Sequence, residues 1–230
     1  MHLNHSPAIW ASYPELVAGV LHVNGVTKQG SVATSIATHF ATARERLSLG
    51  QEGEFPEIKA WRRVFGKMGL KPTQYRSASE SLLRRFRKEA ILPSLHPLVD
   101  LCNALSLANA IPIAVFDVDK VEQSLEVRHA SGAERYLDFS GVVESPEPQE
   151  VIFADQAGNA HARRWANRQS ALSAIRDDSK QVLIVIEAHH EQAAQDIEKI
   201  MTNLSAELQA LWSVKATQAI LRSDAPRFDW

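Results

Sequence analysis

The sequence is poor in cysteine and contains no long hydrophobic run. Its single cysteine, Cys102, excludes an internal disulfide and lies in an apolar stretch, where a buried, inert thiol is the usual outcome. Nothing approaches the roughly 18 uninterrupted apolar residues of a membrane span, and the start lacks the basic and then apolar pattern of a secretory signal. We therefore expect no membrane partner and a cytoplasmic location.

The sequence also lacks a strong overall charge. Its net charge is −2, with 45% hydrophobic and 23% charged residues among 230. These values are typical of globular proteins and exclude disordered, collagen-like and coiled-coil classes. A chain of this length can bury a sizeable core.

The positive charge is concentrated in one part of the chain, residues 59–88, which we call the basic segment. It carries a net charge of +9, so the remaining residues carry −11. Such asymmetry indicates a surface that faces a polyanion, because each Lys or Arg contact with a phosphate releases a counterion. The alternative is a pair of solvated helices whose charges aid solubility. The segment has one acidic residue, Glu80, and ten basic ones: Lys59, Arg62, Arg63, Lys67, Lys71, Arg76, Arg84, Arg85, Arg87 and Lys88.

Hydrophobic periodicity predicts helices in the first half of the chain and short strands in the second. Helices are expected over 31–49, 56–68, 79–92, 97–110 and 191–212, and strands over 15–26, 112–118, 125–129, 135–139, 150–154, 160–165 and 181–187. There is no regular alternation of strands and helices, which favours an α+β fold with a mixed sheet flanked by helices. We expect one domain over 1–230, with 145–148 as an internal loop and a loosely held tail over 224–230.

An ordered set of residues then indicates a family. Val99, Asp100 and Asn103 precede Pro112, then Phe116, Asp117 and Asp119, then Arg128, Ala130 and Glu134. This order is similar to the signature of the B3/B4 domain of bacterial phenylalanyl-tRNA synthetase β subunits. The chain resembles free-standing members more fully, through Trp61, the 68–72 and 75–85 stretches and the 163–170 segment, so the match covers most of 57–175.

The sequence departs from that family in two places. Ala133 stands where the hairpin usually has glycine, and Arg163 to Asn167 replace a glycine-rich segment that helps to form the synthetase editing pocket. Nothing resembles the class II catalytic core or an anticodon-binding module. The resemblance therefore implies a protein that handles aminoacylated tRNA and is not an aminoacyl-tRNA ligase.

Two polar groups are candidates for binding the substrate. Asp100 and Asn103 are three residues apart on one helical face, where Asn103 could orient a water or hold the terminal ribose; alternatively, the pair caps the turn at 117–119. A second set combines planar cations, an aromatic ring and amides, a mixture that stacks bases and binds phosphate. Alternatively, Trp165 belongs to the core and the arginines form a solvated rim. With Arg128 of the signature, this set is Arg163, Arg164, Trp165, Asn167, Arg168, Gln169 and Ser170.

The catalytic candidates are Glu134, Glu150, Asn103 and His96. Either carboxylate could position a water or bind an α-ammonium group, although a surface salt bridge is at least as plausible a role for each. His96 lies close to the Asp100 helix and could act as a base. The adjacent His189 and His190 would point to opposite faces of a strand, so we expect no metal site and no cofactor.

The leading functional hypothesis is hydrolysis, in trans, of the ester of a mischarged or non-standard aminoacyl-tRNA. The amino-acid pocket of a synthetase distinguishes similar side chains by small energies, so a second, hydrolytic site supplies the remaining discrimination. A positioned water can suffice for this reaction because the ester is already reactive. The alternatives are a non-catalytic module that binds RNA or an amino acid, and a structural interaction protein. The expected partner is tRNA or aminoacyl-tRNA, with the amino acid in a pocket and no DNA.

These hypotheses make two spatial predictions. Asn103, Glu134 and Arg164 should converge on a pocket between the 99–103 helix and the strands of 150–165. The basic segment should form a separate tRNA docking face, and charge reversal of Arg84, Arg85 and Arg87 should leave folding intact.

Overall fold

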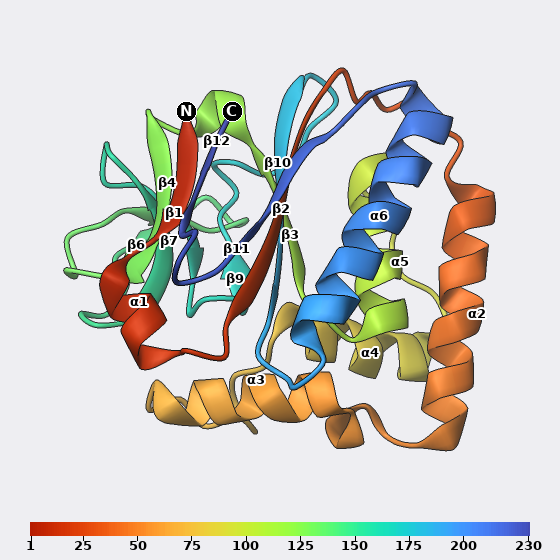
Figure 1. The fold of residues 1–230 in the computed structure, drawn as a ribbon, viewed down its shortest axis with the longest axis horizontal. Helices are drawn as coiled ribbons and strands as arrows, with labels where there is room; N and C mark the ends of the chain where they lie inside the picture. Colours follow the sequence, from red (N-terminus) through yellow and green to blue (C-terminus); the bar gives the residue numbers. More distant parts are fainter.

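A computed structural model describes all of residues 1–230 and contains two stacked β-sheets (Figure 1). The first is a six-stranded mixed sheet in which β1 and β4 are parallel and the other pairs are antiparallel. Its strands, in spatial order, are β12 (Arg227–Asp229), β1 (His2–His5), β4 (Ser124–His129), β7 (Val151–Asp155), β8 (Ala160–Arg163) and β9 (Arg168–Gln169). A small hairpin of β5 (Tyr136–Leu137) and β6 (Val143–Glu144) adjoins β8.

The second sheet has four antiparallel strands and is covered by helices on its outer face (Figure 1). Its spatial order is β11 (Thr217–Leu221), β2 (Val17–Asn24), β10 (Gln181–Ala188) and β3 (Ile113–Asp117). The covering helices are α2 (Ala33–Leu49), α5 (Pro97–Asn109) and α6 (Ala193–Trp212). At the lower end of Figure 1 lie α3 (Pro56–Lys67) and α4 (Ala78–Glu89), while α1 (Pro7–Ser12) follows β1. No helix combines the length and the hydrophobicity needed to cross a membrane.

The strand β10 links the two halves of the core. Leu183 and Val185 face the first sheet, and Val182, Ile184 and Ile186 face the helices. Successive side chains of a strand point to opposite faces, so a strand buried on both faces must be apolar throughout. This explains the unbroken apolar run that makes 181–187 recognisable in the sequence.

The expected α+β fold is confirmed, and each expected helix and strand corresponds to an element of the structure. The elements that were not expected are β1, α1, β6, β9, β11 and β12, which are short or have few apolar residues. The expectation of a loose tail is wrong: β12 pairs with β1, and the Trp230 amide donates to the Met1 carbonyl at 3.1 Å. Pairing between residues more than 200 positions apart leaves no local signal in the sequence.

Beyond the end of β10, His189 is buried in a cage of aromatic rings. The centroids of Trp61, Trp165 and Tyr13 lie 4.7, 5.1 and 6.1 Å from that of His189, all edge-on. Neither ring nitrogen of His189 has a hydrogen-bond partner. Burial, reinforced by positive charge at His5, His190, Arg63 and Lys67, lowers the pKa of His189 from 6.5 to about 3.

This histidine should make the protein sensitive to acid. Because its pKa is lower in the folded state, its contribution to stability is complete above pH 6.5 and is lost as the pH falls from 6.5 towards 3. We expect His189→Leu to reduce the loss of unfolding free energy between pH 7 and pH 4.5, measured by urea denaturation. An equal loss in the native protein and the variant would contradict this expectation.

Candidate functional site

A small pocket, here called the β10 pocket, lies where the ends of the two sheets meet. Its volume is about 60 Å³, room for only a few water molecules. Its walls come from β3, β7, β8, β10, the start of α4 and the 165–169 loop. The lining residues are Ala78, Pro112, Ile113, Ala114, Phe153, Ala162, Trp165, Ala166, Asn167, Arg168, Gln169, Val185 and Glu187.

The 165–169 loop enters the pocket through a strained turn. Arg164 and Trp165 have consecutive positive φ angles of 48° and 54°, a conformation that non-glycine residues rarely adopt. The turn is fixed by the Trp165 amide, which donates to the Val151 carbonyl at 2.7 Å, and by burial of the Trp165 ring, which is 1% exposed. Strain of this kind persists where the surroundings hold it, and often at functional sites.

Two amide side chains of the loop are held by the backbone of neighbouring elements. The Gln169 Nε2 donates to the Val115 carbonyl at 2.6 Å, and the Asn167 Nδ2 donates to the Arg76 carbonyl at 2.7 Å. Each amide nitrogen is thus engaged, and the side-chain oxygen is left as an acceptor. Arg168 lies beside them, with its guanidinium 5.5 Å from the centroid of the Tyr136 ring and partly exposed.

The pocket contains one carboxylate, Glu187, which the sequence analysis did not select. Glu187 Oε1 and His5 Nε2 lie 2.7 Å apart. The side chain of Glu187 is only 5% exposed and that of His5 is 0% exposed. The Trp61 indole donates to the Glu187 carbonyl, so the residue is held through both backbone and side chain. The sequence does contain a signal for this residue. Glu187 is a charged residue near the end of an otherwise apolar strand, and burial of a carboxylate there is costly unless it has a partner.

Asn103 and Asp100 share a helical face, as expected, but they line a different cavity. This α2–α5 groove has a volume of about 430 Å³ and is formed with Val32, Ile36 and Phe40. Asp100 does not cap the 117–119 turn: it accepts bonds from the Ser94 hydroxyl and the Leu95 amide at 2.7 and 2.9 Å. Asp117 instead accepts from the Asp119 amide and the Ser179 hydroxyl.

Glu134 and its partner Arg128 form a structural contact in the β4–β5 turn. Glu134 accepts from Arg128 at 2.6 Å and from the amides of Ser131 and Gly132 at 3.1 Å. Although burial raises the pKa of Glu134, these bonds, led by the Ser131 amide, bring it down to about 2. The turn also accommodates Ala133, because the positive φ of 91° falls on Gly132.

Glu150 and the two arginines after β8 also neutralise one another. Arg163 donates two bonds to Glu150 at 2.9 Å and one to Glu144 at 2.6 Å, with its side chain only 4% exposed. The Arg164 amide donates to Glu150, and its guanidinium packs 4.9 Å from the centroid of the Tyr75 ring. Arg163 is thus unavailable to a phosphate.

The expected convergence of Asn103, Glu134 and Arg164 is therefore wrong. Asn103 lines the α2–α5 groove, Glu134 closes a hairpin turn, and Arg164 stacks on Tyr75. These residues were assigned to one pocket because they belong to one sequence pattern. In the structure, the second sheet lies between α5, which carries Asn103, and the first sheet. Of the residues proposed for substrate binding, Trp165, Asn167, Arg168 and Gln169 do line one pocket.

The histidines and Trp165 also have structural contacts. His96 caps α5, with its Nδ1 accepting from the Leu98 amide at 3.2 Å, so this nitrogen is not free to act as a base. Trp165 belongs to the core cluster, which agrees with the alternative interpretation of the sequence. It is not an exposed platform on which a base could stack. His189 and His190 have separate surroundings: His189 lies in the aromatic cage, and His190 bonds Asp196.

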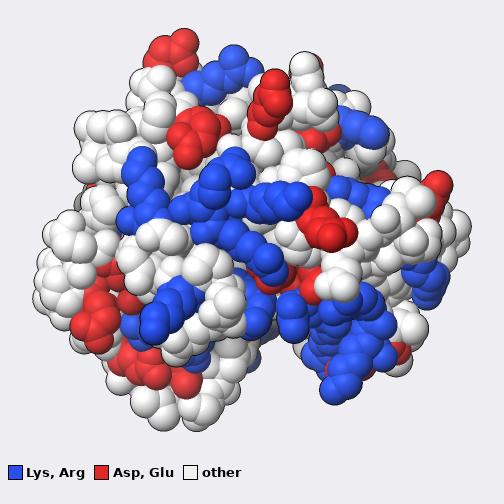
Figure 2. All heavy atoms as spheres, turned by 90° about the horizontal axis from the view of Figure 1, so that it is seen from below, with Lys and Arg blue, Asp and Glu red and all other residues white.

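The basic segment includes α3 and α4, and Lys and Arg side chains gather on the face seen from below, with Asp and Glu side chains among them (Figure 2). Part of it is neutralised by buried acids. Arg62 and Arg76 pair with Glu80, while Arg84 and Arg87 pair with Glu52, and both acids are at most 2% exposed. Arg85 pairs with Glu89, and Lys67 donates to the Ser12 carbonyl. The exposed cations without such a partner are Lys59, Arg63, Lys71 and Lys88.

The expectation that charge reversal of Arg84, Arg85 and Arg87 would spare folding needs correction. Glu52 is buried and pairs with Arg84 and Arg87, so reversal would replace two favourable contacts of a buried carboxylate with repulsive ones. A test of RNA binding therefore has to use the unpaired cations.

Comparison with known proteins agrees with the resemblance seen in the sequence. The model of the B3/4 domain family matches residues 60–210, and the chain belongs to this family. An N-terminal fragment of the phenylalanyl-tRNA synthetase β-subunit from Pyrococcus horikoshii is similar in structure, with a TM-score of 0.48 and 11% sequence identity. The similarity covers 95% of this chain and 53% of that one, so the chain spans about half the length of the fragment. No curated protein matched.

The Glu134 contact generates a stability prediction. Glu134→Gln removes the charge that three donors share, which should cost about 1–3 kcal/mol of unfolding free energy at pH 7. Because the pKa of Glu134 is lowered from 4.5 to about 2, this difference should be full above pH 4.5 and shrink as the pH falls towards 2. Urea denaturation at pH 7 and pH 3 measures it, with Glu147→Gln at an exposed position as the control. A difference that does not depend on pH would contradict the assignment.

Proposed function

We propose that the chain, acting as one unit over 1–230 in the cytoplasm, binds the acceptor end of aminoacyl-tRNA and hydrolyses the ester of a small aminoacyl group in the β10 pocket. The supporting observation is that the pocket and the basic face share a wall. The Ala78 amide, at the start of α4, donates to the Ala166 carbonyl at 2.7 Å, and Asn167 bonds the Arg76 carbonyl. Phosphates on α3 and α4 would thus lie beside the pocket entrance.

The chemistry assigned to the pocket is activation of a water by Glu187. The carboxylate removes a proton from the water, the hydroxide adds to the ester carbonyl carbon, and the bond to the ribose oxygen breaks. The proton passes from Glu187 to that ribose oxygen, so the site is regenerated. His5 holds the carboxylate in position, and the amide oxygens of Asn167 and Gln169 are suited to the α-ammonium group of the amino acid.

The size of the pocket limits the substrate. A volume of about 60 Å³ accommodates a few water molecules and hence a small aminoacyl group, whereas an aromatic side chain would require Trp165 or Phe153 to move. Both rings are almost fully buried in the core, and interiors of this density resist such shifts. Alanyl and seryl esters are therefore the preferred class.

Hydrolysis is tested with a panel of labelled aminoacyl-tRNAs. We expect faster loss of the alanyl and seryl esters than of the phenylalanyl ester. Glu187→Gln should slow this reaction by about 10²-fold or more, the usual contribution of a general base, without weakening tRNA binding. The control is Glu207→Gln, which removes a carboxylate that bonds His39 at 2.8 Å on another part of the molecule.

The outcomes of this assay distinguish the alternatives. Binding of tRNA without loss of any ester would refute hydrolysis and leave a non-catalytic binding module. Equal activity of the native protein and Glu187→Gln would refute the role of Glu187. Loss of activity in the Glu207→Gln control would show that the effect is not specific to the pocket.

Docking of tRNA is tested with the unpaired cations. Reversing Lys59, Arg63 and Lys88 to glutamate should weaken binding and lower the magnitude of the slope of log affinity against log salt by about 2–3. The matched control reverses Lys120, Lys180 and Lys215, three exposed lysines outside the basic segment. Equal effects in the two triple variants would exclude the α3–α4 face as the docking surface.

A further inference from the structure

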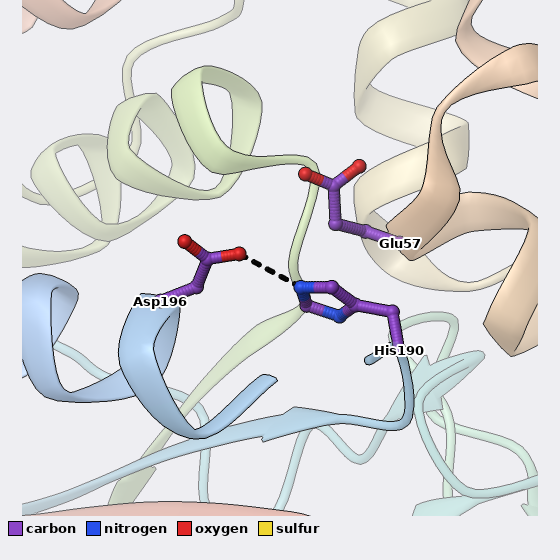
Figure 3. Close-up of side chains that lie close together, drawn as sticks. All are labelled: Glu57, His190 and Asp196. Carbon is purple, nitrogen blue, oxygen red and sulfur yellow. Dashed lines mark hydrogen bonds and ion pairs between the residues drawn. The ribbon is translucent and has the colours of Figure 1, made fainter. Parts of the chain in front are cut away.

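Just beyond β10, three side chains with metal-binding groups meet outside the β10 pocket. Glu57 comes from the first turn of α3, His190 from the residues after β10, and Asp196 from the first turn of α6 (Figure 3). One ligand atom from each lies within 4.8 Å of the other two. The His190 Nε2 and the Asp196 Oδ2 are already 2.7 Å apart.

We propose that Glu57, His190 and Asp196 bind one divalent transition-metal ion, with Zn²⁺ as the physiological candidate. Imidazole and carboxylate groups are both zinc ligands, and the imidazole disfavours Mg²⁺ and Ca²⁺. Tetrahedral zinc with bonds of about 2.0–2.2 Å places its ligand atoms roughly 3.3–3.6 Å apart. The site reaches this geometry by a small approach of Glu57 and a slight opening of the His190–Asp196 contact.

The surroundings are compatible with a bound cation. His190 is 8% exposed, so its ring is confined by the protein, while the Asp196 side chain is 34% exposed and admits water as a fourth ligand. Arg46 donates to both Glu57 oxygens at 2.8 and 2.9 Å, through a single nitrogen. Each carboxylate oxygen can accept more than one bond, so Glu57 can retain Arg46 and also bind the ion.

The proposed metal site does not include the thiol of Cys102. Cys102 is fully buried in the core beneath the helices, and burial raises the pKa of its thiol far above the ordinary value. Cobalt substituted for zinc should consequently show a spectrum of nitrogen and oxygen ligands without a thiolate band. The ion would connect α3, the end of β10 and α6, the three elements that surround the lower end of the second sheet.

The direct test is calorimetric titration of the full, metal-free chain with Zn²⁺, accompanied by the Co²⁺ absorption spectrum. We expect one site per chain. His190→Gln and Asp196→Asn should each weaken binding by at least about tenfold, because loss of a direct ligand should cost no less than loss of an outer partner. The thermal unfolding midpoint should rise with Zn²⁺ in the native protein, because only the folded chain assembles the three ligands.

The matched control is His39→Gln, which removes a histidine from another histidine–carboxylate pair that has no third ligand. It should retain the site. Asp196 is partly exposed, so Asp196→Asn decides the matter if His190→Gln fails to fold. Absence of Zn²⁺ binding, binding that survives Asp196→Asn, or equal loss in His39→Gln would overturn the proposal.

Discussion

The central constraint on this structure is the burial of β10 on both faces. The strand pairs with β2 along one edge and β3 along the other, and it packs on the first sheet and on the helices at once. A strand enclosed in this way cannot move without opening both halves of the core. The last two residues of the strand and the two that follow it are consequently held in fixed positions, and each has different surroundings.

Those four residues organise the lower end of the molecule. Glu187 faces the β10 pocket with His5, Ala188 joins the core beneath the helices, His189 enters the aromatic cage, and His190 meets Asp196. One of the rings that enclose His189, that of Trp165, also lines the pocket. Pocket shape, acid sensitivity and the proposed metal site therefore depend on one strand end.

Charge in this protein has two separate roles. Most carboxylates first expected to do chemistry instead hold arginines in place, as in the Glu134–Arg128 and Glu150–Arg163 contacts. Paired in this way, they fix turns and leave few charges free. Within the basic segment, the exposed cations without a partner lie on α3, on α4 and between them, and the pocket beside α4 has its own carboxylate held by a histidine. Under the proposed function, this division would separate binding of the tRNA phosphates from hydrolysis at the acceptor end.

The sequence predicted the parts of the fold that depend on local pattern. The apolar run of β10 and the stripe of α6 reflect burial that each residue experiences along its own element. The terminal strands depend on partners at the other end of the chain. The site likewise depends on residues that are far apart in the sequence. Asn103 and Glu134 share a family signature but lie on opposite sides of the second sheet. Glu187 was missed because a lone acid near the end of a strand has no distinctive spacing, and only the fold brings it to His5 and the 165–169 loop.

The central claim is that the β10 pocket receives the aminoacyl end of tRNA. A stable analogue, adenosine that carries alanine through a 3′-amide in place of the ester, tests it without turnover. In a crystal structure of the complex, we expect the alanyl group beside Glu187, Asn167 and Gln169, with the adenosine towards the start of α4. Placement of the analogue in the α2–α5 groove beside Asn103, with the β10 pocket unchanged, would contradict the account.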